Sequence, residues 1–347
     1  MIGTKEMTIK EIAKRAGVAK STVSAVLNGR NALKPATREN ILQIMKDLNY
    51  RPKGFARNMR NGDAGKSIGI IVKEMNYPFF ASIAEGAKEY ADSKGYSLLI
   101  ASSDYDHESE KKLTNLFSAK DIRGAIIAPI VEGDLEIEHL CRLKMLNYPF
   151  VLLASIEGMM ANVVEIDNMW AIKKAVDYLI DNGHKKIVHF AGPSESAHTK
   201  GRIVGFRNAF SESTLAFNKD MIVPIGSNYK VSYENATRYF KSKKRSEYPT
   251  AIVCFNDLQA LAVMTALRDL RVNVPKDVSI IGNDDIHFDE IYPVPLTTIR
   301  SPQKEIGQKA AEILINNIES PALLPIEHIV LDTELIIRKS TRTLKMR

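Results

Sequence analysis

The sequence predicts an α/β protein in which a small helical head precedes a larger body of doubly wound parallel sheets. Residues 1–66 hold 14 Lys and Arg against five Asp and Glu, whereas 67–347 hold the other 34 basic and 36 acidic residues. The net charge of +7 therefore belongs to the head. From Ser67 onward, short apolar runs alternate with amphipathic stretches. At about 150 residues per domain, a chain of 347 residues holds two or three domains.

Three short helices are expected in the head. Thr8 and Glu11 fit a capping box, in which each side chain accepts from a free backbone N–H at the start of a helix. A second helix is expected over 20–27 and ends at Asn28, before a glycine. A third begins near Pro35, whose restricted φ suits a first helical turn.

The body alternates strand and helix patterns. The runs SIGIIV, YSLLIAS, GAIIAPI, PFVLLAS, KIVHFAG, AIVCFND and VSIIGND predict strands. Helices are expected over 80–94, 108–119, 170–182, 201–212, 232–242 and 257–270. Continuous apolar strands separated by helices indicate parallel sheets covered on both faces, and the number of units favours two lobes.

Composition excludes several classes of protein. A hydrophobic share of 45% with 26% charged residues is typical of a globular chain rather than a disordered one. Cys141 and Cys254 lie in apolar runs without CxxC spacing, which indicates a reducing compartment. Because neither a signal-peptide core nor an apolar run of about 18 residues occurs, we expect a cytoplasmic protein without a membrane anchor.

Small residues in the head predict a helix-turn-helix. Ala13, Ala16 and Gly17 permit close approach of two helices, and Val23 anchors the second helix from inside. The side chains left facing outward are Lys20, Ser21, Thr22 and Ala25. Together with the basic charge, this pattern predicts DNA binding. The alternative is an ordinary helical hairpin with a solvated basic surface.

TIKEIAKRAGVAKSTVSAVLNG resembles the head of the lactose/galactose repressor (LacI/GalR) family, and RPKGFARNMRNG resembles its hinge helix, here about 52–60. The resemblance continues through NYPFF, DNGHKKIVHFAGP, FNDLQALAVMTALRDLRVNVPKDVSIIGNDD and PLTTIRSP, over nearly the whole chain. It implies a transcriptional regulator, most simply a repressor, that binds a pseudo-palindromic operator as a homodimer. By position, the residues it assigns to DNA are Thr8, Lys20, Ser21, Thr22, Ser24, Ala25, Asn28, Arg57, Met59 and Arg60.

Ala25 departs from this family pattern, because it stands where an arginine is usual. A guanidinium grips guanine with two hydrogen bonds, whereas alanine offers only a methyl contact. The base preference is therefore expected to differ from the commoner family pattern.

Met59 occupies the position at which the family's hinge helix inserts an apolar wedge between base pairs. Such a wedge unstacks a base step, and wider contact with the bent DNA offsets that cost. Met59→Gly is expected to weaken specific operator binding far more than non-specific binding in a salt-titrated gel-shift assay. Equal weakening of both would make Met59 a plain apolar linker residue.

The body resembles type I periplasmic sugar-binding proteins, whose lobes close over a ligand at the carboxyl ends of their strands. We expect a head of 1–62, a linker of 63–66 and a body of 67–347. The first lobe is expected to hold 67–165 with 297–325, and the second 166–296 with 326–347. The residues expected to bind a small-molecule effector are Phe80, Asp167, Arg202, Tyr229, Asp257 and Asp284.

Each of these residue types suits a sugar-like ligand. Asp167, Asp257 and Asp284 follow apolar runs and carry lone pairs for adjacent hydroxyls. Arg202 matches the family's ligand-binding arginine, a forked donor, and Phe80 matches its pocket aromatic. The alternatives are a helix cap for Asp167, core packing for Phe80, and surface charge for the others.

Departures from the family pattern leave the ligand unassigned. Tyr77 stands where many relatives have Asn, Asn283 precedes the Asp pair in place of an aromatic residue, and the loop before Tyr229 is short. We expect a sugar or sugar derivative as effector. A non-sugar corepressor, a stand-alone solute-binding protein and an enzyme remain the alternatives.

No catalytic or metal site is expected. The chain has no complete P-loop, no GxSxG and no HExxH, and its seven histidines show no metal-ligand spacing. Neither a cofactor nor a catalytic residue is therefore assigned. The tail 339–347 lacks apolar heptads, so no tetramerising coiled coil is expected.

Overall fold

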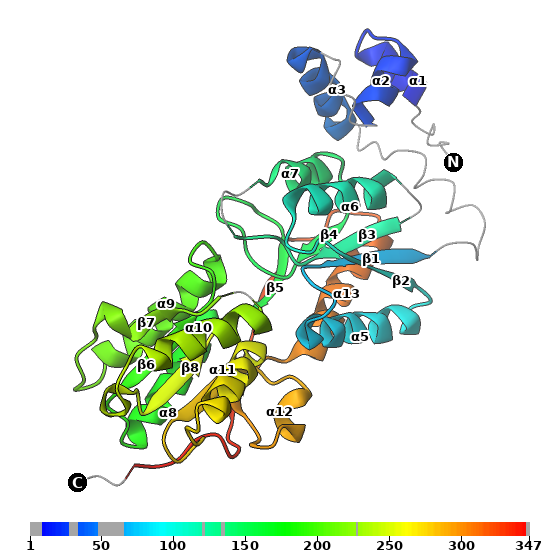
Figure 1. The fold of residues 1–347 in the computed structure, drawn as a ribbon. Helices are drawn as coiled ribbons and strands as arrows, with labels where there is room; N and C mark the ends of the chain where they lie inside the picture. Colours follow the sequence, from blue (N-terminus) through cyan, green and yellow to red (C-terminus); the bar gives the residue numbers. More distant parts are fainter. Residues whose placement is uncertain are drawn as a thin grey trace.

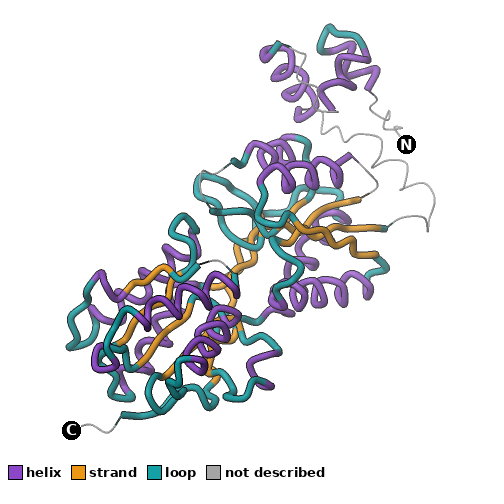
Figure 2. Tube along the Cα trace, in the orientation of Figure 1, coloured by secondary structure: helices purple, strands orange, loops and turns teal. Residues whose placement is uncertain are grey.

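The computed structural model describes residues 9–27, 34–47, 66–119, 122–132, 136–226 and 228–344. They form a helical head and a body of two lobes, and each lobe is a six-stranded sheet with helices on both faces (Figures 1 and 2). The expected α/β fold is therefore confirmed. The expected hinge helix at 52–60 and five of the expected DNA contacts lie outside the described residues: Thr8, Asn28, Arg57, Met59 and Arg60.

The head consists of α1 (Ile9–Arg15), α2 (Lys20–Leu27) and α3 (Pro35–Asp47). These bounds match the expected second helix and the expected start at Pro35. Helix α1 contacts both of the others, and Ile12, Val23 and Ile41 are fully buried between them. Gly17 has φ +65° in the turn after α1, a conformation that glycine adopts without strain.

All strands of the first lobe are parallel. The sheet has the order β11-β5-β4-β3-β1-β2. Its strands are β1 (Ser67–Val72), β2 (Ser97–Ser102), β3 (Ile122–Ile127), β4 (Phe150–Leu152), β5 (Asn162–Ile166) and β11 (His328–Leu331). One face is covered by the packed pair α5 (Pro78–Ser93) and α13 (Gln303–Glu319), and the other by α6 (His107–Ala119) and α7 (Glu138–Met145).

The second lobe repeats this plan with one antiparallel strand. Its order is β12-β10-β9-β8-β6-β7, and β12 runs antiparallel to β10. The strands are β6 (Ile187–Ala191), β7 (Ile222–Pro224), β8 (Ala251–Cys254), β9 (Ser279–Asp284), β10 (Thr297–Arg300) and β12 (Glu334–Ile336). The helix pairs are α8 (Asn168–Asp181) with α9 (Ala197–Ser211), and α10 (Tyr229–Lys241) with α11 (Asp257–Asp269). A short α12 (Phe288–Ile291) and 3-10 turns at Lys219–Met221 and Arg245–Glu247 complete the lobe.

The chain crosses between the lobes after β5, after β10 and after β11. The first crossing follows Ile166, the last residue of β5. The second comes after Arg300 instead of before Thr297, because β10 pairs with β9 in the second sheet. The third comes after Leu331 instead of before residue 326, because β11 pairs with β5 in the first sheet. Neither of these four-residue strands was among the runs predicted as strands, and pairing with a neighbouring strand assigns each of them to its lobe.

Two further expectations concern the chain as a whole. Both cysteines are free, and Cys254 is fully buried. Within the described ranges, no helix is both long enough and apolar enough to cross a membrane.

Candidate functional site

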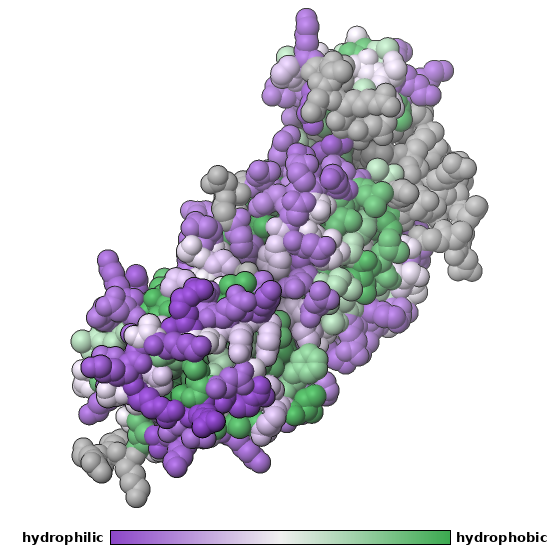
Figure 3. Space-filling model, viewed as in Figure 1, coloured by the Kyte–Doolittle hydropathy of each residue, from purple (hydrophilic) through white to green (hydrophobic). Residues whose placement is uncertain are grey.

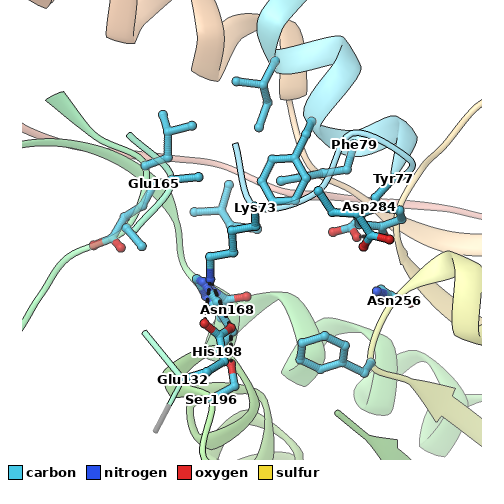
Figure 4. A pocket seen from close by; sticks show the side chains of 18 of the residues that line it. Lys73, Tyr77, Phe79, Glu132, Glu165, Asn168, Ser196, His198, Asn256 and Asp284 are labelled. Carbon is cyan, nitrogen blue, oxygen red and sulfur yellow. Dashed lines mark hydrogen bonds and ion pairs between the residues drawn. The ribbon is translucent and has the colours of Figure 1, made fainter. Parts of the chain in front are cut away.

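A cavity of about 420 Å³ lies between the two lobes, at the carboxyl ends of their parallel strands. The first lobe contributes Lys73, Glu74, Tyr77, Phe79, Phe80, Ile83, Tyr105, Ala128, Pro129, Glu132, Leu153, Ala154, Glu165, Ile166 and Ile306. The second lobe contributes Asn168, Pro193, Ser196, His198, Arg202, Asn228, Phe255, Asn256 and Asp284. Figure 4 shows Lys73, Glu132, Ser196 and His198 gathered on one side, with Tyr77 and Asp284 on the other.

Asp284, the last residue of β9, is hydrogen-bonded to both lobes. Its Oδ2 accepts a hydrogen bond from the hydroxyl of Tyr77, which belongs to the first lobe. Its Oδ1 accepts from Asn283 Nδ2 at 2.7 Å and lies 4.0 Å from Arg202 Nη2. The bond between Tyr77 and Asp284 therefore joins the lobes directly across the cavity.

The backbone at Asp284 is strained. Asp284 has φ +128° and Asp285 has φ +60°, values that cost about 1–3 kcal/mol in residues other than glycine. Two contacts hold this conformation. Gln303 Nε2 donates to the carbonyl of Asp284, and Arg300 Nε lies 2.6 Å from Asp285 Oδ2. As a result, adjacent carboxyls point in different directions, and only that of Asp284 lines the cavity.

Arg202 on α9 connects three elements of the second lobe. Its Nε donates to Asn168 Oδ1 at 2.9 Å, and its Nη1 donates to the carbonyl of Phe255. The guanidinium also lies 4.3 Å from the ring centroid of Phe255, a cation–π contact. Burial lowers the pKa of Arg202, and Asp284 opposes that shift. Because guanidinium pKa values begin above 12, the side chain keeps its charge.

A second group of contacts between the lobes surrounds Lys73. Its Nζ lies 3.0 Å from Glu132 Oε1 and 3.2 Å from Oε2. Ser196 of the second lobe donates to Glu132 Oε1 at 3.3 Å, and Ala197 N donates to Val131 O at 3.2 Å. Burial lowers the pKa of Lys73, and the Glu132 carboxylate opposes that shift. No sequence motif links Lys73 with Glu132, because the two residues are 59 positions apart.

His198 lines the cavity as a neutral imidazole. Burial lowers its pKa well below the ordinary value, and the charges of Lys73 and Arg202 lower it further. Its Nδ1 lies 3.3 Å from Asn168 Nδ2, the amide that also accepts from Arg202 through its oxygen. Because an amide nitrogen can only donate, Nδ1 accepts and the ring proton lies on Nε2.

Three aromatic rings from the segment NYPFF form one wall of the cavity. Phe79 and Phe80 meet edge to face with centroids 5.3 Å apart, and Tyr77 stacks on Phe79 at 5.9 Å. Pro78 begins α5 directly after Tyr77, which places these side chains at the start of the helix, beside the cavity. This wall offers aromatic surface to a ring-shaped ligand.

The structure brings together three of the six expected effector residues: Phe80, Arg202 and Asp284 all line the cavity. The other three lie elsewhere. Asp167 is an exposed N-cap of α8, where Oδ1 accepts from Trp170 N at 2.9 Å, so the helix-cap alternative describes it. Tyr229 is 40% exposed, and its hydroxyl pairs with Thr265 at 2.9 Å.

Asp257 is buried within the second lobe and does not line the cavity. Its carboxylate accepts from Thr298 Oγ1 at 2.5 Å and from Ile286 N at 3.1 Å, so it ties α11 to β10 and to the loop after β9. Burial raises its pKa. The structure does not bring Asp257 to the cavity with Arg202 and Asp284, because its buried carboxylate is bonded within the second lobe.

The charges that line the cavity are mostly negative. Four carboxyl groups, those of Glu74, Glu132, Glu165 and Asp284, face only two cations, Lys73 and Arg202. Burial raises the pKa of Asp284 to about 7, although the Arg202 guanidinium opposes this shift. The cavity therefore favours neutral ligands over anions. The described residues contain no group of His, Cys, Asp or Glu that could hold a metal ion.

The expected recognition helix of the head, α2, presents its polar face outward. Lys20 and Ser21 are exposed, Thr22, Ser24 and Ala25 are half-buried, and Val23 and Val26 point into the core of the head. This arrangement matches the amphipathic pattern on which the helix-turn-helix prediction was based.

Comparisons with known proteins agree with both parts of the chain. Residues 8–53 match the family described as bacterial regulatory proteins, lacI family, and residues 176–341 match a periplasmic binding protein-like domain. The HTH-type transcriptional repressor PurR of Photobacterium profundum is 31% identical over 343 residues, which cover 97% of this chain and 99% of the relative. The PurR repressor of Haemophilus influenzae is 32% identical over 339 residues, again 97% and 99%.

Solved structures with the same fold carry small ligands. The transcriptional regulator CelR in complex with cellobiose has a TM-score of 0.71 at 25% identity, over 96% of this chain and 99% of that one. A LacI-family regulator from Enterococcus faecium with bound ribose has a TM-score of 0.70 at 25% identity, over 81% and 100%.

These relatives are repressors and regulators, which confirms the expectation that the chain is not an enzyme. The expected family is confirmed as well, since the PurR relative is matched along almost its entire length. The chain belongs to the LacI family of bacterial regulatory proteins and is a DNA-binding transcriptional regulator.

Proposed function

We propose that this protein is a repressor whose operator affinity is set by a small, neutral, polyhydroxylated effector, a sugar or sugar derivative, bound between the lobes. The observation that carries the proposal is the cavity between the lobes with the Tyr77–Asp284 hydrogen bond across it. A ligand that competes for Asp284 changes how the lobes are held together. It is therefore in a position to shift the balance between two lobe arrangements.

The lining supports a polyhydroxylated ligand in particular. Sugar rings combine an apolar face with hydroxyl donors, and the cavity combines the Phe79–Phe80 wall with carboxylate acceptors. A volume of about 420 Å³ suits a compact molecule of one or two rings. Because carboxyls outnumber cations, phosphorylated and carboxylated sugars are disfavoured.

A planar heterocycle is the second candidate. One ring of the aromatic wall, that of Phe79, would stack against such a heterocycle. Asn256, whose Oδ1 caps α11, offers its amide NH2 to the edge of the heterocycle. The same cavity then serves a non-sugar corepressor, and only ligand binding separates the two classes.

We propose that effector binding reaches the DNA through rotation of the first lobes across a homodimer. Edge strand β2 carries exposed Leu99 (48%) and Ile100 (45%), and neighbouring α6 carries exposed Leu116 (45%). Figure 3 shows an apolar area beside this edge of the first lobe. A second copy packed there would cover these side chains and the open strand edge.

The remaining assignments extend this proposal to the head. We propose that residues 1–62 are the DNA-binding domain and that the protein acts in the cytoplasm. The residues proposed to contact the operator from α2 are Lys20, Ser21, Thr22, Ser24 and Ala25. Thr8, Asn28, Arg57, Met59 and Arg60 are proposed to add further DNA contacts. Twofold symmetry would double the basic footprint, so affinity should fall steeply with salt.

The proposal is tested with a thermal-shift screen of neutral sugars, sugar phosphates and nucleobases on the full chain. Ligand binding raises the unfolding midpoint by mass action. We expect a neutral sugar to raise the midpoint and to change operator affinity in a gel shift, with no response to the phosphorylated form. A response to nucleobases alone would support the second candidate, and tighter binding of sugar phosphates would contradict the charge argument.

Effector affinity is expected to depend on pH through Asp284, whose pKa is raised to about 7. The ionised carboxylate is the better acceptor for hydroxyls, so affinity is full above pH 7 and is lost as the pH falls through 7. One linked proton lowers the affinity about tenfold between pH 8 and pH 6. The stability of the unliganded protein changes in the opposite direction, because a raised pKa makes ionisation costly as the pH rises. Titration calorimetry at both pH values measures the effect, and Asp284→Asn should remove it.

A further inference from the structure

We propose that the second lobe carries a separate site for an oligophosphate group, at the end of its sheet opposite the effector cavity. A depression of about 500 Å³ lies at the amino ends of β6, β8 and β9. Five basic residues line it: Lys185, Lys186, Arg245, Lys276 and Arg342. They come from the loops before these three strands and from the C-terminal segment, where Arg342 N donates to Ser279 Oγ at 3.1 Å.

The five cations are neutralised only in part. A hydrogen bond from the Asn273 backbone lowers the pKa of Asp277, and the charges of Arg245 and Lys276 lower it further. Lys186 Nζ donates to Ser246 O at 3.1 Å, and Arg245 Nη2 donates to Arg271 O at 3.1 Å. Among the residues that the structure describes, none of the five forms an ion pair. The lining contains one acid, Asp277, and its Oδ2 already accepts from Asn273 N at 2.8 Å and from Asn273 Nδ2 at 3.1 Å.

Helix ends provide the strongest alternative explanation for this charge. The C-termini of α8, α10 and α11 lead into these loops, and a helix C-terminus carries roughly half a negative charge. Three termini and Asp277 together offset roughly half of the five positive charges. A substantial positive surplus remains in a body whose residues 67–347 hold 34 basic and 36 acidic side chains. The negative partial charges of the helix C-termini therefore explain only part of the basic cluster.

The shape of the site favours a compact, highly charged ligand. The cations surround a concave surface, which matches a small group with several negative charges. The aromatic residue of the lining, Tyr248, is held against Phe240 by an edge-to-face contact at 4.9 Å and by the hydrogen bond from its hydroxyl to Phe240 O. A single ring held in this way does not provide the series of stacking platforms on which single-stranded nucleic acid binds.

The test uses the full chain and inorganic tripolyphosphate, measured by titration calorimetry. Since the basic head would also attract a polyanion, duplex DNA is added in excess to occupy it. We expect one tripolyphosphate per protomer and at least tenfold weaker binding in the double variant Lys186→Ala/Lys276→Ala. The matched control, Lys200→Ala/Lys230→Ala, removes two exposed lysines from the opposite end of the same lobe and should leave the affinity unchanged.

Three outcomes would overturn the proposal. The first is equal weakening in both double variants, which would indicate a general charge effect. The second is complete displacement of tripolyphosphate by duplex DNA, which would place the polyanion on the head or make the depression a nucleic-acid surface. The third is a lowered unfolding midpoint in Lys186→Ala/Lys276→Ala with unchanged tripolyphosphate affinity. That result would mean that the two lysines only stabilise the helix C-termini. None of these outcomes depends on the identity of the effector in the other cavity.

Discussion

Asp284→Ala is expected to abolish the effector response while leaving operator binding intact. The substitution removes the acceptor for Tyr77 and Asn283 and the carboxylate that lies 4.0 Å from the buried Arg202. Hydrogen bonds to a charged group are each worth about 1.5–3 kcal/mol, so losing two of them from a ligand lowers its affinity at least about 100-fold. Titration calorimetry with the effector, together with a gel shift with operator DNA, measures both properties.

The matched control for this variant is Asp167→Ala. Asp167 follows an apolar run of the same kind but caps α8 outside the cavity, so its loss should cost about 1 kcal/mol of stability and leave effector affinity unchanged. Asp284→Asn keeps the size of the side chain, so it controls for misfolding around Arg202. A normal titration with Asp284→Ala would contradict the assignment of this site.

Deletion of residues 1–62 is expected to remove DNA binding altogether while effector binding stays within about twofold. The remaining body has slightly more acidic than basic residues, so it cannot neutralise phosphates as the head does. The cavity is formed entirely by residues from Lys73 onward, and the head contributes no strand to the sheet of either lobe.

The truncation also separates the regulator from a stand-alone solute-binding protein. If the full chain bound no DNA at moderate salt, the solute-binding alternative would stand. If the truncated body bound DNA as tightly as the full chain, with the same salt dependence, the head could not be the DNA-binding domain. The control is the effector titration on the same truncated protein, which shows that its lobes are folded.

Sequence patterns predicted the bounds of elements in which apolar residues recur with a clear period. The strand at 67–72, the helix at 20–27 and the start at Pro35 match the structure, because burial of one face imposes a clear period on the residues. Strands β10 and β11 were not among the runs predicted as strands, so the expected limits of the lobes differ from those in the structure. Pairing with a neighbouring strand decided those limits instead.

The candidate site shows the same division. Arg202, Asp284 and Phe80 were predicted from sequence, and all three line the cavity. Asp257 and Asp167 also follow apolar runs, yet Asp257 is bonded to Thr298 and Ile286 away from the cavity and Asp167 caps a helix. A position after a strand indicates which end of the sheet a side chain occupies, but tertiary packing determines whether the side chain lines the cavity.

By itself, the sequence determined the fold class, the separation of a basic head from a nearly neutral body, and the family to which the chain belongs. Those properties depend on local periodicity, on charge counts and on contiguous motifs. Only the tertiary structure placed Lys73 beside Glu132, Tyr77 against Asp284, and five cations around one depression. Tyr77 and Asp284 are 207 positions apart, and no local pattern links residues that meet only when two lobes are folded and brought together.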